Sequence, residues 1–228
     1  MFGVVALEPI ATRELLRDAP RSLRALSREH PDGWGVAIHD AHDWVVHRST
    51  SCAADCARYG ELAEGIATRL LVAHIRQKTV GATALANTHP FRRGAFVFAH
   101  NGTIKDVAAL VARSSPERLA QIEGDTDSER LFAFVMTHVD DACDVERGVA
   151  RAVQELHAFG DIGSASFLLS CGERLYAHRL GRSLFVLIRS GAVVIASEQL
   201  TGEAWQELPE RTVVVVDHAA PQPRPLAA

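Results

Sequence analysis

The chain has 228 residues, of which 47% are hydrophobic and 23% charged, so it is long enough to bury a full core. Its net charge of -4 and its scattered basic residues disfavour nucleic acid or anionic lipid as partners. It has no run of about 18 apolar residues and no charged segment followed by an apolar core. We therefore expect a cytoplasmic protein with no membrane span and no secretion signal.

The first two thirds of the chain alternate between strand and helix patterns. The strands expected from short apolar or alternating runs are residues 2–7, 34–40, 44–48, 70–75 and 95–99. The helices expected from periodicities of three and four are residues 11–18, 22–28, 105–112, 128–139 and 145–159. The second and third strands flank a turn at 40–43, which predicts a hairpin with Trp34 in the core. Two strands, 70–75 and 95–99, end in polar residues, where we expect the reactive site.

The last third changes to short strands separated by glycines. These strands are residues 165–170, 175–178, 184–189, 193–196 and 213–216. Their regular spacing predicts an antiparallel meander. No repeat or linker divides the chain, so we expect one domain over residues 1–218, of the α+β class with largely antiparallel sheets. Pro221, Pro223 and Pro225 exclude a helix or central strand, and we expect residues 219–228 to form a loose tail.

Five polar segments in the first 130 residues carry a family resemblance. They are residues 30–35 (HPDGWG), 73–76 (AHIR) with Thr79, 87–91 (NTHPF), 100–102 (HNG) and 124–129 (GDTDSE). Together, in this order and spacing, they resemble the class II glutamine amidotransferases. Residues 196–200 (ASEQL), followed by Trp205, resemble the C-terminal strand and loop of that family. The resemblance implies the four-layer αββα sandwich of N-terminal-nucleophile hydrolases.

The resemblance also implies roles for particular residues. Arg76 falls where the family pairs an arginine with the substrate α-carboxylate, a task suited to a planar bidentate donor, and Thr79 would add a hydroxyl. Asn101 and Gly102 correspond to the oxyanion hole, where an amide and a backbone N–H donate to developing negative charge. Asp127 corresponds to the acidic residue that holds the substrate ammonium. His89 corresponds to a residue near the pocket mouth, with Asn87 beside it.

Position 2 departs from the family pattern. The family has a cysteine there, which supplies both a thiol and, once the initiator methionine is removed, a free α-amino group. Here the residue is Phe2, which has no nucleophilic atom, and a bulky second residue generally blocks removal of the methionine. An alternating phenylalanine on a first strand is typically a core residue. In the family's register, however, its ring would face the glutamine site, so we expect weakened glutamine binding.

Each motif also has a plainer interpretation when taken alone. Asn-Gly is a common turn, and Asp125 or Asp127 is a natural cap for a helix that starts near Ser128. His74, His89 and His100 lack the spacing of metal ligands on one element. Four cysteines, Cys52, Cys56, Cys143 and Cys171, form no paired C-x-x-C pattern, and none is nominated as a nucleophile. We therefore expect no metal and no cofactor.

Three functions remain open. The first is a disarmed homologue that binds glutamine, a γ-glutamyl compound or a partner protein without turnover; retention of Arg76, Asn101 and Asp127 favours a small-molecule ligand. The second is an active amidotransferase or γ-glutamyl amide hydrolase in small-molecule biosynthesis, which requires cysteine at position 2 or another attacking group. The third is a subunit that contributes only surface to a biosynthetic partner protein.

Overall fold

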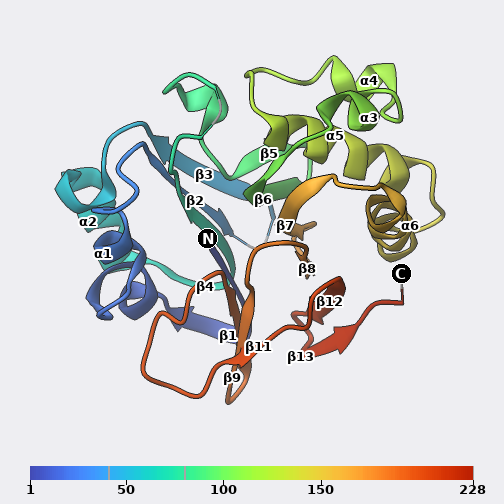
Figure 1. Cartoon of the computed structure of the whole chain (residues 1–228). Helices are drawn as coiled ribbons and strands as arrows, with labels where there is room; N and C mark the ends of the chain where they lie inside the picture. Colours follow the sequence, from blue (N-terminus) through green and yellow to red (C-terminus); the bar gives the residue numbers. More distant parts are fainter. Residues whose placement is uncertain (41, 80, 228) are drawn as a thin grey trace.

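Two antiparallel sheets packed face to face form the centre of the molecule, and helices cover both outer faces (Figure 1). The structure, a computed structural model, describes residues 1–40, 42–79 and 81–227. One buried cluster lies between the sheets, a second lies between the first sheet and its helices, and a third lies between the second sheet and its helices. Three core layers between four layers of secondary structure confirm the expected αββα sandwich.

Sheet A contains the start of the chain near its centre, in the strand order β11-β9-β10-β1-β4-β2-β3. Its strands are β1 (Phe2–Ala11), β2 (Trp34–His39), β3 (Trp44–Ser49), β4 (Ala67–Ile75), β9 (Phe185–Arg189), β10 (Ala192–Ala196) and β11 (Gln206–Glu207). The β2–β3 hairpin is confirmed, with Trp34 fully buried. Phe2 at the start of β1 pairs with Ala73 on one side and Ala196 on the other.

Sheet B has the strand order β13-β12-β8-β7-β6-β5. Its strands are β5 (Phe91–Arg93), β6 (Phe96–Ile104), β7 (Gly163–Ser170), β8 (Arg174–Arg179), β12 (Thr212–Asp217) and β13 (Ala220–Pro225). The expected meander is wrong, because the chain passes from β7 and β8 in sheet B to β9 and β10 in sheet A and then back to β12. Alternation predicts each strand but not which sheet it joins.

The helices divide between the two outer faces, as Figure 1 shows. A π-helix (Glu14–Asp18), α1 (Leu23–Leu26) and α2 (Ala57–Gly65) pack on sheet A. On sheet B, α3 (Val107–Val111), α5 (Asp127–Asp140) and α6 (Val145–Ala158) contribute to the core, and α4 (Pro116–Leu119) packs against α5. Two 3₁₀ turns cover Ala53–Asp55 and Leu85–Asn87. Within the described ranges, no helix is both long and apolar enough to cross a membrane.

The C-terminal segment differs from the expected loose tail. Residues Ala220–Pro225 form β13 at the edge of sheet B, antiparallel to β12. The prolines occupy alternate residues, so their missing N–H groups all fall on the same side of the strand. Just beyond the strand, the N–H of Leu226 donates to the Val213 carbonyl at 2.9 Å. An edge strand needs donors on one side only, which is why proline is tolerated here.

Two helical glycines offer a test of the packing between α5 and α6. A Cβ at Gly148 in α6 would lie 2.5 Å from the Val139 Cα, whereas a Cβ at Gly60 in α2 would meet nothing within 4 Å. Alanine is favoured over glycine in a helix by about 1 kcal/mol. We therefore expect Gly60→Ala to raise the free energy of unfolding by about 0.5–1 kcal/mol and Gly148→Ala to lower it. Denaturant unfolding measures both, and a stabilised Gly148→Ala protein would contradict this packing.

Candidate functional site

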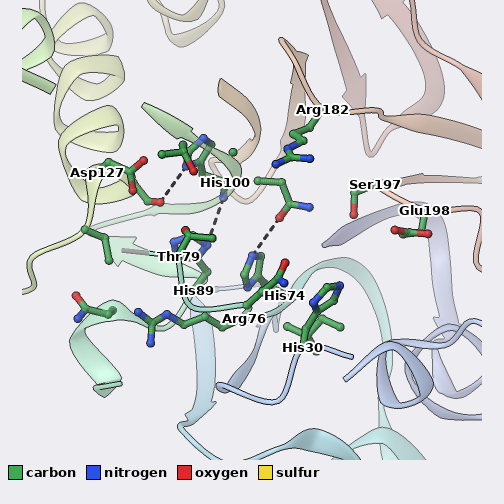
Figure 2. A pocket seen from close by; sticks show the side chains of 18 of the residues that line it. His30, His74, Arg76, Thr79, His89, His100, Asp127, Arg182, Ser197 and Glu198 are labelled. Carbon is green, nitrogen blue, oxygen red and sulfur yellow. Dashed lines mark hydrogen bonds between the residues drawn. The ribbon is translucent and has the colours of Figure 1, made fainter. Parts of the chain in front are cut away.

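A pocket of about 560 Å³ lies where the ends of β4 and β10 meet β6 and the N-terminus of α5 (Figure 2). Six of the seven residues singled out from the sequence line it: Arg76, Thr79, His89, Asn101, Gly102 and Asp127. Asn87 lines it as well. Phe2 is the exception. The fold therefore brings the polar motifs together from four separate segments of the chain.

Asn101 is oriented by a buried histidine at the end of β4. The Nε2 of His74 lies 3.1 Å from the Asn101 side-chain oxygen, and the two residues face each other from different sheets. With that oxygen accepting from His74, the Asn101 amide nitrogen remains as the donor end of the side chain. The arrangement gives β6 a fixed amide donor beside the pocket.

Gly102 has a conformation and surroundings that only glycine fits. Its φ is +152°, and a Cβ there would lie 2.1 Å from the Ser164 carbonyl oxygen on β7. This close approach lets His100 Nε2 reach the same carbonyl at 3.0 Å, while His100 Nδ1 lies 2.9 Å from Ser128 Oγ. His100 thus ties β6 to β7 and to the start of α5.

Asp127 holds α5 against β6 rather than capping its own helix. Its Oδ2 accepts from the Ile104 backbone N–H at 2.7 Å, and the residue is only 7% exposed. Thr126 occupies the N-cap position and makes no side-chain capping bond. The expected cap by Asp125 or Asp127 is therefore wrong, because both carboxylates bond to other segments. Asp127 also lies in the first turn of α5, where the helix dipole stabilises a negative charge.

The loop after β4 is attached to the loop before α5. The amide nitrogen of Asn87 donates to Asp125 Oδ1 at 2.6 Å, and the Asn87 side-chain oxygen accepts from the Asp125 N–H at 3.0 Å. Arg76, which directly follows β4, is buried in the pocket wall, and Thr79 is exposed at the rim of the pocket. Asn87 is thus a structural tie that positions the pocket wall.

Three histidines in the pocket wall are held neutral. Burial lowers the pKa of His74 and His89 well below the usual value, and the neighbouring His89 and His100 rings, respectively, add to the effect. Burial also lowers the pKa of His100, although the Asp127 carboxylate acts in the opposite direction. The His74 and His89 rings lie 4.4 Å apart, so charging either one would place a cation against its neighbour.

The three histidines lie together although they come from separate elements. His74 bonds to Asn101, His100 bonds to Ser128 and to the Ser164 carbonyl, and His89 Nδ1 accepts from the His100 N–H at 3.5 Å. Among the described residues, no group of three or more His, Cys, Asp or Glu side chains is placed to hold a metal. No cysteine lines the described part of the pocket.

The start of β1 lies beside the pocket, but its side chains point elsewhere. Phe2 is fully buried with Val4, Leu23 and Trp34 in the core between sheet A and its helices. The Met1 carbonyl accepts from the Ser197 N–H at 2.9 Å, which places the Met1 backbone at the end of β10. The ring of Phe2 therefore takes no room from a pocket ligand, and the steric reason for weakened glutamine binding does not hold.

Several pocket residues had not been singled out from the sequence. Arg182 and Ser183 come from the turn between β8 and β9, and Ser197 and Glu198 follow β10. His30 precedes β2. His30, Ser197 and Glu198 stand in segments that carry the family resemblance, but nothing in the local pattern distinguishes Arg182 from other arginines in turns.

Comparison with known proteins identifies the class. A family profile described as glutamine amidotransferases class-II matches residues 19–192, more than half of the chain. The chain therefore belongs to the class II glutamine amidotransferases.

Two individual relatives are 28% and 30% identical to the chain. The chain is 28% identical over 218 residues to a γ-glutamyl-hercynylcysteine sulfoxide hydrolase of Mycobacterium tuberculosis, covering 91% of this chain and 88% of the relative. It is 30% identical over 162 residues to a putative glutamine amidotransferase of Haemophilus influenzae, covering 65% of this chain and 52% of the relative.

Solved structures match along nearly the whole chain. A glutamine aminotransferase class-II domain protein from Silicibacter pomeroyi has a TM-score of 0.72 at 20% identity, with 100% of this chain and 99% of that one covered. An allosteric regulatory enzyme of purine biosynthesis has a TM-score of 0.76 at 18% identity, with 99% and 48% covered. These identities establish the fold alone, which is that of the N-terminal-nucleophile hydrolases.

The neutral histidines predict a pH dependence of stability. A histidine whose pKa is lowered in the folded state favours folding above its unfolded pKa of about 6.5, and that contribution is lost as the pH falls. We expect the free energy of unfolding to decrease between pH 7 and pH 5. His89→Gln should reduce this slope by up to about 1.4 kcal/mol per pH unit. Denaturant unfolding across this range measures the slope, and equal slopes for the two proteins would refute the assignment.

Proposed function

We propose that this protein binds glutamine or a γ-glutamyl compound in the pocket and does not cleave it by the thiol route of its family. The observation that carries the proposal is Phe2. Position 2 has neither thiol nor hydroxyl, and its ring is fully buried in the outer core of sheet A. Because no cysteine lines the described part of the pocket, nothing there replaces the missing thiol.

The charges of the pocket support a ligand with both a carboxylate and an ammonium group. Arg76 offers a planar donor suited to the α-carboxylate, and Asp127 offers a carboxylate suited to the α-ammonium. The histidines between them are neutral, so they add no competing charge. Asn101 and the backbone at Gly102 would donate to the side-chain carbonyl of the ligand. Thr79 would complete the pocket mouth, whereas His89, expected near the mouth, is buried in the pocket wall.

Two buried polar atoms also support an occupied pocket. Within the described ranges, Thr126 Oγ1 and His74 Nδ1 have no hydrogen-bond partner, and both residues line the pocket. Buried polar groups in native proteins are almost always hydrogen-bonded, to protein, water or ligand. In the pocket wall, a bound water or ligand would supply the partner that these two atoms lack.

The relatives favour a second candidate, an active γ-glutamyl amide hydrolase. The Mycobacterium tuberculosis relative that carries such a name matches along nearly its full length. Cleavage by this chain would require another group to attack the amide, since Phe2 supplies none. Steady release of glutamate by the unaltered protein would support this second candidate and overturn the first.

Asp127→Asn tests the proposed ammonium contact. A bond between charged groups contributes about 1.5–3 kcal/mol, so its loss should weaken glutamine or γ-glutamylethylamide binding about ten- to a hundredfold. Asp144→Asn is the matched control, because Asp144 is the exposed N-cap of α6 and lies outside the pocket. Calorimetric titration measures both variants. If the two bind the ligand equally, Asp127 has no part in recognition.

Phe2→Cys tests whether only the thiol is missing, with Phe2→Ala as its control. Both variants remove the buried ring at a cost of about 3–5 kcal/mol, but only one introduces a nucleophile. We expect glutamate release from the Phe2→Cys protein alone, in preparations whose intact mass shows that the initiator methionine has been removed. Removal of Met1 takes away the bond between the Ser197 N–H and the Met1 carbonyl, so the new first residue is free to turn its thiol from the outer core to the pocket. Thermal unfolding confirms that both variants are folded at the assay temperature. Release by neither folded variant, when both still bind glutamine, would show that more than the thiol is missing.

A further inference from the structure

We infer that the side of the pocket formed by the β8–β9 turn is a subsite for a carboxylate on the amine portion of a γ-glutamyl ligand, and that Arg182 binds this carboxylate. The inference rests on the proposed function and names the ligand class more narrowly. Such a subsite would favour γ-glutamyl amides of amino acids over glutamine itself and over γ-glutamyl amides of neutral or cationic amines.

The backbone of Arg182 is fixed by a buried hydroxyl. Ser166 on β7 is fully buried, and its Oγ donates to the Arg182 carbonyl at 2.6 Å while accepting from the Arg182 N–H at 3.3 Å. Gly181, just before it, has a φ of +78°, and a Cβ there would lie 2.7 Å from Ser164 Oγ. The turn therefore packs closely against β7 beside Gly102. This contact fixes the backbone position from which the Arg182 guanidinium reaches the pocket.

Arg182 and Arg76 approach the pocket from opposite sides, as Figure 2 shows, with His74 and His100 between them. If Arg76 and Asp127 hold the glutamyl end, Arg182 lies on the side where the substituent of the amide nitrogen would extend. The pocket volume of about 560 Å³ falls in the range found for drug-sized ligands, about 300–1,000 Å³. This pocket is larger than a free amino acid needs. The pocket thus has both space and charge for a second group.

The carboxylates near the β8–β9 turn are each paired with an arginine other than Arg182. Glu198 in the pocket lining is ion-paired with Arg21, and Glu207 and Glu210, which contact the turn at Ser183 and Gly181, are ion-paired with Arg179. Ser183 donates its hydroxyl to Glu207 at 3.0 Å. In the part of the chain that the structure describes, Arg182 forms no ion pair. A planar guanidinium is well suited to bidentate binding of a carboxylate, and it would repel a cationic amine portion.

Two ligands that differ only in the proposed contact test the inference. γ-Glutamylglycine carries a carboxylate where γ-glutamylethylamide carries a methyl group, and the rest of the two molecules is the same. Because Arg182 is exposed, we expect a moderate preference of the unaltered protein for γ-glutamylglycine, about tenfold in dissociation constant. Calorimetric titration at low ionic strength measures both ligands.

Variants assign the preference to one residue. Arg182→Ala should remove the preference without changing the affinity for γ-glutamylethylamide, and Arg182→Lys should keep part of it, because charge remains but the bidentate geometry is lost. Arg151→Ala is the matched control, since Arg151 is an exposed arginine on α6 outside the pocket. It should behave as the unaltered protein does.

The outcomes separate this inference from the proposed function. Equal affinity of the unaltered protein for the two ligands, or an undiminished preference in Arg182→Ala, overturns the carboxylate subsite and leaves the proposed function standing. Failure of the unaltered protein to bind either ligand overturns both. A preference that is lost in Arg182→Ala and kept in Arg151→Ala supports the subsite.

Discussion

The alternation of side chains along β1 decides what the pocket contains. Gly3 faces sheet B so closely that a Cβ there would lie 2.7 Å from a Leu175 methyl group. Because successive residues of a strand face opposite sides, Phe2 must turn outward toward the helices, where it is fully buried. The same strand begins between Ala73 and Ala196, so its backbone borders the pocket while the Phe2 ring stays out of it. The phenylalanine at position 2 therefore leaves the pocket open.

A chain of hydrogen bonds across the two sheets keeps the rest of the site in place. His74 on sheet A bonds to Asn101 on sheet B, and His100 bonds to Ser128 on α5. Burial keeps these rings neutral, so each can donate from one nitrogen and accept at the other. The pocket thus has an uncharged floor between charged ends. Such a floor orients a polar ligand without competing for its carboxylate or ammonium groups.

Local chemistry explains which features were predictable from the sequence. The hairpin of β2 and β3 and the helices α5 and α6 follow from periodicity within one segment, and they appear as expected. β9 and β10 join sheet A because β10 pairs with β1, which is distant in the sequence. A local pattern carries no information about such a distant pairing. The pocket motifs were found through their joint resemblance to one family. Arg182 was not, because its position depends on the distant Ser166 hydroxyl.

Phe2 is a buried side chain that stabilises the fold, whereas Arg182 is an exposed charge that lines the pocket. A protein that served only as a scaffold would need the buried contacts of Phe2, Trp34 and Tyr59, which stabilise sheet A. It would have no need to direct Arg182 into the pocket, since an exposed charged side chain adds little to stability. Charges that add little to folding but point into a common space are best explained by a ligand whose own charges they match. The charges that line the pocket therefore argue for recognition of a ligand.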